Sequence, residues 1–203
     1  MPDDESWLIN EIVATTFRTN DISLMLAFVN DEDLEWFVRK QIFRIVFWEA
    51  LRNCRWHIAD ACISVGYPMA PAEFSDGGPL HDTIDVLGDR PDVTQWLIER
   101  GAEIERRDHS TGTPLLAAID HNCDDTVRML VDHGADVNAS TTIDDYVTPL
   151  MIAADTGNRK IVELLLASGA QVEASDRWGS TAAEYADRKG HADIASLIRS
   201  VNF

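Results

Sequence analysis

A regular spacing of glycines restricts the fold of this chain more than any other feature. Gly66, Gly101, Gly134 and Gly169 follow one another at intervals of 33 to 35 residues, and the last three are each followed by alanine. A period in this range is typical of stacked-repeat proteins, in which each unit packs only against its neighbours. Such arrays present an elongated surface to other macromolecules, so we expect a binding protein before any catalytic one.

The clearest unit covers residues 112–139 and predicts two short helices. Thr113 is expected to cap the first helix, and Pro114 fits the first helical turn because its missing N–H needs no partner there. The apolar positions of the two helices are Leu115, Ala118, Ile119, Val127, Leu130 and Val131. Gly134 is expected to end the second helix in a left-handed conformation. The stretch from there to Thr148 is then an extended finger.

With its neighbours, this unit resembles the ankyrin-repeat family. The resemblance is carried by Thr113-Pro114-Leu115, Thr148-Pro149-Leu150-Met151-Ile152-Ala153-Ala154, Gly190-His191 and the three Gly-Ala pairs. It is strong from Pro79 to Phe203 and weaker back to Arg44. It implies an all-α fold, an ankyrin-repeat solenoid of helix-turn-helix units with extended finger loops and an N-terminal helical cap. It also implies that His81, after Pro79-Leu80, ties neighbouring loops together.

The predicted organisation is an N-terminal helical cap in residues 1–43 and an ankyrin-repeat domain in residues 44–203. The units are expected at residues 44–77 (a degenerate repeat), 78–111, 112–146, 147–179 and 180–203 (a C-terminal capping repeat). Differences in spacing place two extra residues in the turn 87–91 and two in the finger 140–146. Residues 1–43 are expected to cover the open end of the stack, with a separate binding element as the alternative.

The charge of the chain indicates the kind of partner. It has 35 acidic and 17 basic residues and a formal net charge of -18. Nucleic-acid backbones and anionic membranes would repel this charge, so we expect binding to neither. A basic protein partner is favoured, although the acidity could serve solubility alone. A monomer is the expected state.

Features of the chain also favour a cytoplasmic location. The acidic N-terminus lacks the positive region of a secretory signal, and no apolar run is long enough to span a bilayer. The three cysteines are an odd number without paired spacing, which argues against a disulfide framework.

No catalytic arrangement is evident, and neither a cofactor nor a metal is expected. Cys54, His57 and Cys62 lie near one another, but a zinc site normally has four ligands. Packing in a helical core is therefore the preferred interpretation of these three residues. The pair Gly77-Gly78 lacks the lysine or threonine of a phosphate loop.

The resemblance implies a partner-binding surface made of the finger tips and the inner face of the first helices. On the fingers these positions are His109, Ser110, Asp144, Asp145, Tyr146, Arg177 and Trp178, and on the helices they are Asp85, Asp120, His121, Asp155 and Thr156. Trp178 is an expected interface anchor, unless it folds back on the adjacent finger.

Three hypotheses of function follow from this surface and this charge. The first is an acidic inhibitor of a basic partner, such as an immunity protein that neutralises a nuclease-like toxin. The second is a scaffold or adaptor whose partner keeps its activity. The third is a small metal-dependent enzyme in residues 1–76, which the weak ligand set disfavours.

Overall fold

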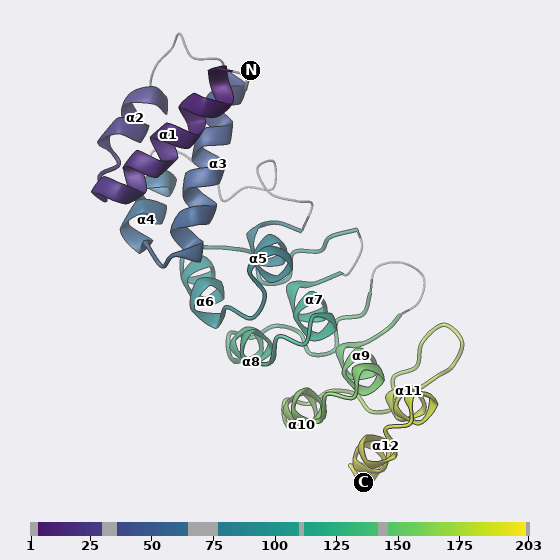
Figure 1. The fold of residues 1–203 in the computed structure, drawn as a ribbon. Coiled ribbons are helices and arrows are strands. Elements are labelled where there is room, and N and C mark those ends of the chain that lie inside the picture. The colour runs from purple at the N-terminus through teal and green to yellow at the C-terminus, as the bar shows by residue number, and fades with distance from the viewer. Residues whose placement is uncertain (1–3, 30–35, 65–76, 110–111, 142–145, 202–203) are drawn as a thin grey trace. The chain divides into compact units, whose positions relative to one another are not determined.

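A computed structural model of the 203-residue chain describes residues 4–29, 36–64, 77–109, 112–141 and 146–201. Twelve helices lie in these ranges, and the described residues contain no strand, only one isolated bridge between Ser175 and Thr181. The contacts divide the chain into two compact units, Met1–Pro68 and Met69–Phe203. Figure 1 shows the ribbon, and the two units are described separately below. The all-helical class predicted from the sequence is confirmed.

The first unit contains four helices. They are α1 (Asp4–Thr19), α2 (Ser23–Val29), α3 (Trp36–Arg52) and α4 (Trp56–Ser64). Helix α3 contacts the other three. Apolar side chains from all four helices are buried: Ile12, Met25, Ile42, Val46, Phe47, Leu51, Ile58 and Cys62. Trp7 of α1 is 63% exposed and does not take part in this core.

The division of the chain differs from the one expected. Helix α3 runs through residues 43 and 44, where the sequence placed the start of the repeats, and the two compact units divide between Pro68 and Met69. The reason is physical: Ile42 and Val46, on either side of the expected boundary, are buried one turn apart on the same helix. The capping role expected of residues 1–43 stays a prediction.

The second unit contains four helix pairs. The first helices are α5 (Pro79–Leu87), α7 (Pro114–Asp120), α9 (Pro149–Thr156) and α11 (Ala182–Lys189). The second helices are α6 (Pro91–Glu99), α8 (Asp124–Asp132), α10 (Arg159–Ala167) and α12 (Ala192–Ser200). Each helix contacts its equivalent in the next pair, so the helices form two parallel rows with the fingers on the side of the first row (Figure 1).

The starts of α7 and α9 follow the chemistry predicted for Thr-Pro-Leu. The side chain of Thr113 accepts a hydrogen bond from the N–H of Leu116, and Thr148 accepts one from Met151. The proline that follows each threonine occupies the first helical turn. Since a proline has no N–H to satisfy, this turn is the place where it costs least.

The Gly-Ala pairs end three of the second helices. At Gly134 the backbone φ is +88°, which favours glycine strongly over any residue with a Cβ. The N–H of Gly134 donates to the carbonyl of Val131, and the N–H of Ala135 donates to that of Leu130. These two bonds satisfy helix-end carbonyls in a Schellman motif. Gly101-Ala102 and Gly169-Ala170 make the same pair of bonds, so the near-copies in the sequence are three identical helix ends.

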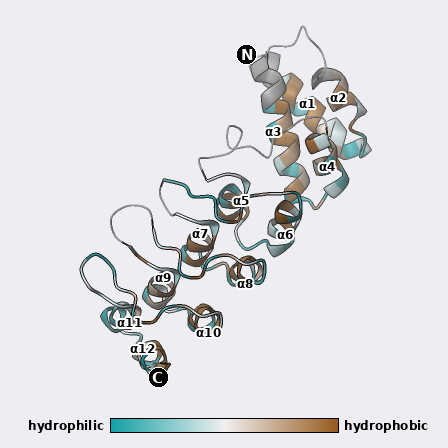
Figure 2. Ribbon diagram, turned by 180° about the vertical axis from the view of Figure 1, so that it is seen from behind, coloured by the Kyte–Doolittle hydropathy of each residue, from teal (hydrophilic) through white to brown (hydrophobic). Residues whose placement is uncertain are grey.

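Between the two rows lies one continuous apolar core. Fully buried side chains from both rows meet there: Leu80, Val93, Leu97, Leu115, Val127, Leu130, Leu150, Ile161 and Leu165. The small-residue position of the repeat is occupied by Thr83, Ala118, Ala153 and Ala186, and all four are buried. Figure 2 shows the apolar character of α7 and α9 and the more polar character of α11. Small side chains at this position allow neighbouring first helices to approach closely.

Both predicted insertions are present, but one of them lies elsewhere than expected. On two fingers the hydrogen bond that closes the loop joins residues four apart. The backbone N–H of Asp108 donates to the carbonyl oxygen of Gly112, and that of Asp176 donates to the carbonyl oxygen of Ser180. On the longer finger Thr141 N–H donates to Val147, six positions on. The other two extra residues are present, but they lengthen α5, which has nine residues against seven in α7. The turns after these two helices, residues 88–90 and 121–123, have the same length, so the expected place in the turn is wrong.

Buried His81 links two loops, as the resemblance implies. Its Nδ1 lies 2.8 Å from the carbonyl oxygen of Gly77, and its Nε2 lies 3.0 Å from that of Gly112. A Cβ at position 77 would come within 2.4 Å of the imidazole ring. Glycine at position 77 is therefore a requirement of space, since any side chain there would displace the histidine that joins the loop before α5 to the finger before α7.

Candidate protein-binding surface

The last finger is organised by a buried aspartate that sequence analysis did not single out. Asp176 is only 5% exposed. Its carboxylate accepts hydrogen bonds from the backbone N–H of Trp178 (2.9 Å), the N–H of Ser180 (2.7 Å) and the hydroxyl of Tyr185 (2.9 Å). A signal was present in the sequence, because Asp108 occupies the equivalent position and accepts from the N–H of Gly112 at 2.6 Å. The finger is thus preformed before any partner arrives.

The hydrogen bonds to Asp176 also set its charge. Burial by itself would raise the pKa of this carboxyl, but the donors from Ser180, Tyr185 and Trp178, with the nearby Arg188 cation, outweigh burial and lower the pKa below its usual range. Burial and the same carboxylate raise the pKa of the Tyr185 phenol. The finger is therefore held together by an ionised carboxylate and a neutral phenol at neutral pH.

Trp178 lies at the tip of this finger and is 67% exposed. The alternative in which it is buried against the adjacent finger does not agree with this exposure. The guanidinium carbon of Arg177 lies 5.2 Å from the centroid of the Trp178 ring, within the range of a cation–π contact. The tip consequently presents a large apolar surface together with a cation.

Tyr146 occupies a conformation on the longer finger that is unusual for an aromatic residue. Its φ is +53°, and it stands at the finger position where Gly179, with φ +84°, stands in the last repeat. A side chain in this left-handed region costs roughly 1–2 kcal/mol. Tyr146 is also 60% exposed, so packing within the fold does not explain it. Strain of this kind is concentrated at functional sites.

The remaining finger positions are only partly described. His109 is exposed on the first finger. Ser110, Asp144 and Asp145 lie outside the described residues, so their assignment stays a prediction.

Acidic residues of the first helices lie in a row, and the structure shows that some of them are already paired. Asp85 Oδ1 lies 3.4 Å from His121 Nε2, and Asp155 Oδ2 lies 3.1 Å from Lys189 Nζ. Lys189 was not among the predicted site residues, although its place at the end of its helix matches that of Thr156. Asp120 is exposed and belongs to the same row. The row therefore offers less free negative charge than the sequence suggested.

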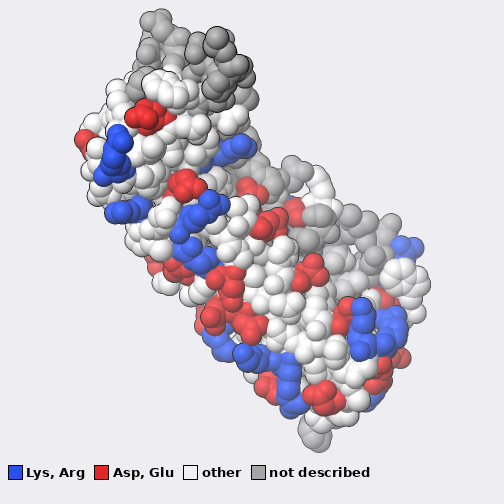
Figure 3. All heavy atoms as spheres, viewed as in Figure 1, with Lys and Arg blue, Asp and Glu red and all other residues white. Residues whose placement is uncertain are grey.

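Charges of both signs are interspersed on the face of the second unit seen in Figure 3. The net charge of -18 is thus not concentrated in one acidic patch on that face. Cations of the second helices are also paired across repeats. Arg159 of α10 lies 3.1 Å from Asp193 of α12, and Lys160 of α10 lies 3.5 Å from Asp124 of α8. Local position, more than total charge, decides where a charged partner can be held.

The fingers stand on a connected base. The backbone N–H of Asp136 donates to the Glu105 carboxylate, and that of Gln171 donates to the Asn138 side chain, both at 2.8 Å. Each bond joins one finger to the next along the stack. A binding surface whose parts are tied in this way loses little conformational freedom when it binds.

The last repeat has polar residues at positions that are buried in the repeat before it. Glu184 and Asp187 are exposed, whereas Met151 and Ala154, at the equivalent positions of α9, are fully buried. Asp187 forms an ion pair with Arg199 from α12. These substitutions give the outer face of the last helix pair a polar character, as the predicted capping repeat requires.

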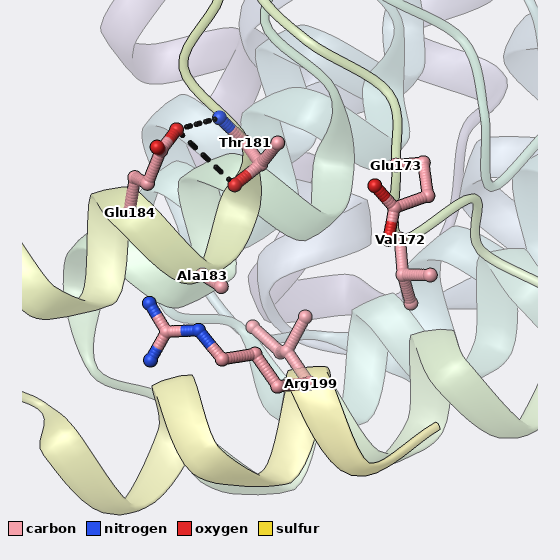
Figure 4. A pocket seen from close by; sticks show the side chains of 7 residues that line it. Val172, Glu173, Thr181, Ala183, Glu184 and Arg199 are labelled. Carbon is pink, nitrogen blue, oxygen red and sulfur yellow. Dashed lines mark hydrogen bonds between the residues drawn. The ribbon is translucent and has the colours of Figure 1, made fainter. Parts of the chain in front are cut away.

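A hollow of about 190 Å³ lies on this helix pair. It is lined by Val172, Glu173, Thr181, Ala183, Glu184, Ile198 and Arg199. Figure 4 shows the Glu184 carboxylate turned toward Thr181, to which it is hydrogen-bonded, and the Arg199 side chain extended alongside Ala183. The hollow has a simple cause, because Ala183 stands where Leu115 and Leu150 stand in the preceding repeats.

The three residues considered for a metal site in the first unit do not share one environment. Cys62 is buried in the core, and burial raises the pKa of its thiol to about 12. Cys54 and His57 are exposed. Core packing thus explains Cys62 but not the other two. Among the described residues, no group of three or more His, Cys, Asp and Glu side chains could hold a metal ion. None of the described helices is long and apolar enough to cross a membrane.

These features define a class of protein: a helical repeat array with preformed fingers. The family model for ankyrin repeats in many copies matches residues 115–166. This part of the chain consists of ankyrin repeats, and such repeats imply protein–protein interaction.

Several curated proteins are similar over the repeats. Ankyrin repeat and KH domain-containing protein mask of Drosophila melanogaster is 38% identical over 99 residues, 49% of this chain and 2% of that protein. Glycerophosphocholine phosphodiesterase gde1 of Schizosaccharomyces pombe is 36% identical over 114 residues, 56% of this chain and 10% of that protein. Putative ankyrin repeat protein FPV031 of fowlpox virus is 45% identical over 85 residues, 41% of this chain and 25% of that protein. This chain spans a quarter or less of each of these three relatives.

Proposed function

We propose that the chain binds a basic protein partner through the finger tips and the exposed ends of the first helices, and that it acts by binding rather than by catalysis. The observation that carries the proposal is the pair of exposed aromatic side chains, Tyr146 and Trp178, on neighbouring fingers. Tyrosine and tryptophan are the residues most enriched at the energetic centres of protein interfaces. The net charge of -18 supports a basic partner, because it would steer one toward the surface.

The test is affinity capture from the native source with the wild-type chain and with Trp178→Ala, followed by mass spectrometry. We expect at least one protein that the wild type retains and the variant loses. Ser168→Ala is the control, since Ser168 is an exposed residue at the end of α10, in the second row. Partners retained equally by all three baits would overturn the assignment of this surface.

The charge part of the proposal has a separate test. Affinity for the purified partner should fall as salt is added, because screening shortens the Debye length from about 30 Å at 0.01 M to about 10 Å at 0.1 M. An affinity that is insensitive to salt would remove the argument for a basic partner. It would leave the aromatic anchors in place.

A finer form of the proposal is that binding inhibits the partner, as in an immunity protein that neutralises a nuclease-like toxin. Its support is the net charge alone, which could imitate the polyanion that a nuclease binds. The competing form is a scaffold or adaptor. The activity of the purified partner, assayed with and without this chain, separates them: inhibition is lost activity, and scaffolding leaves activity unchanged.

A further inference from the structure

Two consecutive residues at or near the end of each first helix of the second unit occupy equivalent positions, and some of them pair across repeats. These endings are Asp85-Val86, Asp120-His121, Asp155-Thr156 and Arg188-Lys189. The carboxylate of the first residue of one ending lies near the side chain of the second residue of the ending in the following repeat. Asp85 pairs with His121 in this way at 3.4 Å, and Asp155 pairs with Lys189 at 3.1 Å.

The middle step of this register lacks a basic side chain. The residue that corresponds to His121 and Lys189 opposite Asp120 is Thr156, whose hydroxyl donates to the carbonyl of Ala153 in its own helix at 3.2 Å. Within the described residues, no ion pair or hydrogen bond engages the Asp120 carboxylate. One of three equivalent carboxylates is therefore left without the partner that the other two have.

The position of Asp120 makes this gap costly to the chain itself. Asp120 is the last residue of α7, and Thr156 is the last residue of α9. Both helices direct the negative end of their dipole toward this place, where an acid is unfavourable and a cation is favourable. A local preference that is violated with no gain inside the fold points to a function outside it.

The gap and the base of the aromatic finger that precedes α9 stand at the two ends of this helix. Helix α9 has eight residues, and at 1.5 Å each it rises about 12 Å from the base of the Tyr146 finger to Thr156. An extended chain covers that distance in about four residues. A single partner segment can thus reach both points.

We propose that the partner fills this gap with a lysine or arginine side chain, about four residues from an apolar residue that contacts Tyr146. The incoming cation takes the place opposite Asp120 that Lys189 holds opposite Asp155. This inference rests on the proposed function, because it names the group by which the same surface recognises its partner. The contact with Asp120 and Tyr146 would let the middle repeats decide which partner the chain recognises.

Thr156→Lys is the sharpest test, because it supplies the missing cation from within the chain. Its local context matches that of Lys189, since each position is the last of its helix and precedes a glycine in the left-handed conformation, Gly157 or Gly190. Ser168→Lys is the matched control. Ser168 also follows a helix and precedes left-handed Gly169, but it belongs to the second row. The control adds the same charge at the same kind of helix end.

The probe is a phage-displayed library of random dodecapeptides selected on the wild-type chain. We expect the enriched peptides to carry lysine or arginine about four residues from an apolar residue. An enriched peptide should bind Thr156→Lys and Asp120→Asn roughly tenfold more weakly than the wild type, measured by fluorescence anisotropy. It should bind Ser168→Lys nearly as well as the wild type. Far-UV circular dichroism confirms that each variant is folded.

The outcomes separate this inference from the proposed function. If Thr156→Lys and Ser168→Lys weaken peptide binding equally, total charge explains the effect, and the proposed contact with Asp120 is wrong. Enriched peptides without lysine or arginine would overturn it as well. Binding that is lost in Trp178→Ala but unchanged in Thr156→Lys would overturn the gap and leave the surface standing. A library without any peptide that needs Trp178 would count against both.

Discussion

Apolar side chains of two kinds occur in the repeat units, and their exposure separates them. Leu130 of α8 is fully buried between the two rows, whereas Trp178 stands at a finger tip with 67% of its surface exposed. Helical spacing predicted that Leu130 is buried, and the resemblance implied that Trp178 lies at a finger tip. The spacing works because helix periodicity fixes which side chain faces the core, and a finger tip has no core to face.

Truncation of these two residues should have different consequences. We expect Leu130→Ala to lower the free energy of unfolding by about 2–5 kcal/mol, because it leaves a cavity in the core. Trp178→Ala should change the free energy by less than about 0.5 kcal/mol, as for most exposed residues. Urea denaturation followed by circular dichroism measures both values. Similar losses in the two variants would contradict the assignment of faces.

Asp176 should make the stability of the last finger depend on pH. The donors to its carboxylate favour the ionised form, so its pKa in the folded protein lies below the value of about 3.9 expected for an unfolded aspartate. A carboxyl group whose pKa is lowered by folding stabilises the folded protein at pH values above its pKa in the unfolded chain. This stabilisation is lost as the pH falls through the pKa of the folded state.

We therefore expect the difference in unfolding free energy between the wild type and Asp176→Asn to be largest above about pH 4 and to shrink below it. Urea denaturation at a series of pH values from neutral to acidic gives the measurement. A difference that stays constant through the series would show that the charge of Asp176 does not matter.

At the scale of elements, helix α8 is capped by a residue from the neighbouring repeat. Helix α8 follows Cys123, whose side chain does not cap it. Its first N–H groups are capped instead by Asp89 from the preceding turn, whose carboxylate accepts from Thr126 (2.8 Å) and Asp125 (3.2 Å). The turn 88–90, which follows the longer helix α5, thus carries the residue that caps the first turn of α8 in the next repeat.

Asp89→Ala should lower the free energy of unfolding by about 0.5–2 kcal/mol, the usual cost of a lost helix cap. Asp132→Ala is the control, because Asp132 is exposed at the other end of α8, where an acid opposes the helix dipole. Its removal should cost nothing. The comparison needs only chemical denaturation of three proteins, and an equal effect of both changes would rule out capping by Asp89.

The starts and ends of elements were predictable where local chemistry decides them. Thr113, Thr148 and Gly134 act as the sequence indicated, because each satisfies backbone groups within a few residues of itself. The course of α3 across residues 43 and 44 was not predictable in this way. Its continuation depends on Ile42 and Val46 being buried together, which is a property of packing.

At the scale of the whole molecule, the charge of -18 acts on stability as well as on binding. With 35 acidic and 17 basic residues, like charges repel one another in the folded chain. Cross-repeat ion pairs of the described residues, such as the exposed pair Arg159–Asp193, are each worth about 0–1 kcal/mol. Repulsion should therefore outweigh them.

Added salt should consequently raise the melting temperature of the protein. Raising ionic strength from about 0.01 M to 0.15 M reduces the Debye length from about 30 Å to about 8 Å, which screens repulsion between distant charges most. Thermal melts followed by circular dichroism at these two salt concentrations give the answer. A lower melting temperature at the higher salt would mean that the ion pairs dominate.

By itself, the sequence determined the helical repeats, their caps and the two insertions, because each depends on residues close together in the chain. It also predicted which positions are finger tips, but not their state. Only the tertiary structure decided that Asp85 and Asp155 are paired, that Asp120 is not, and that Asp176 is buried under Tyr185. Those facts depend on which side chains of different repeats meet across the stack, and distance in space is not encoded in any local pattern.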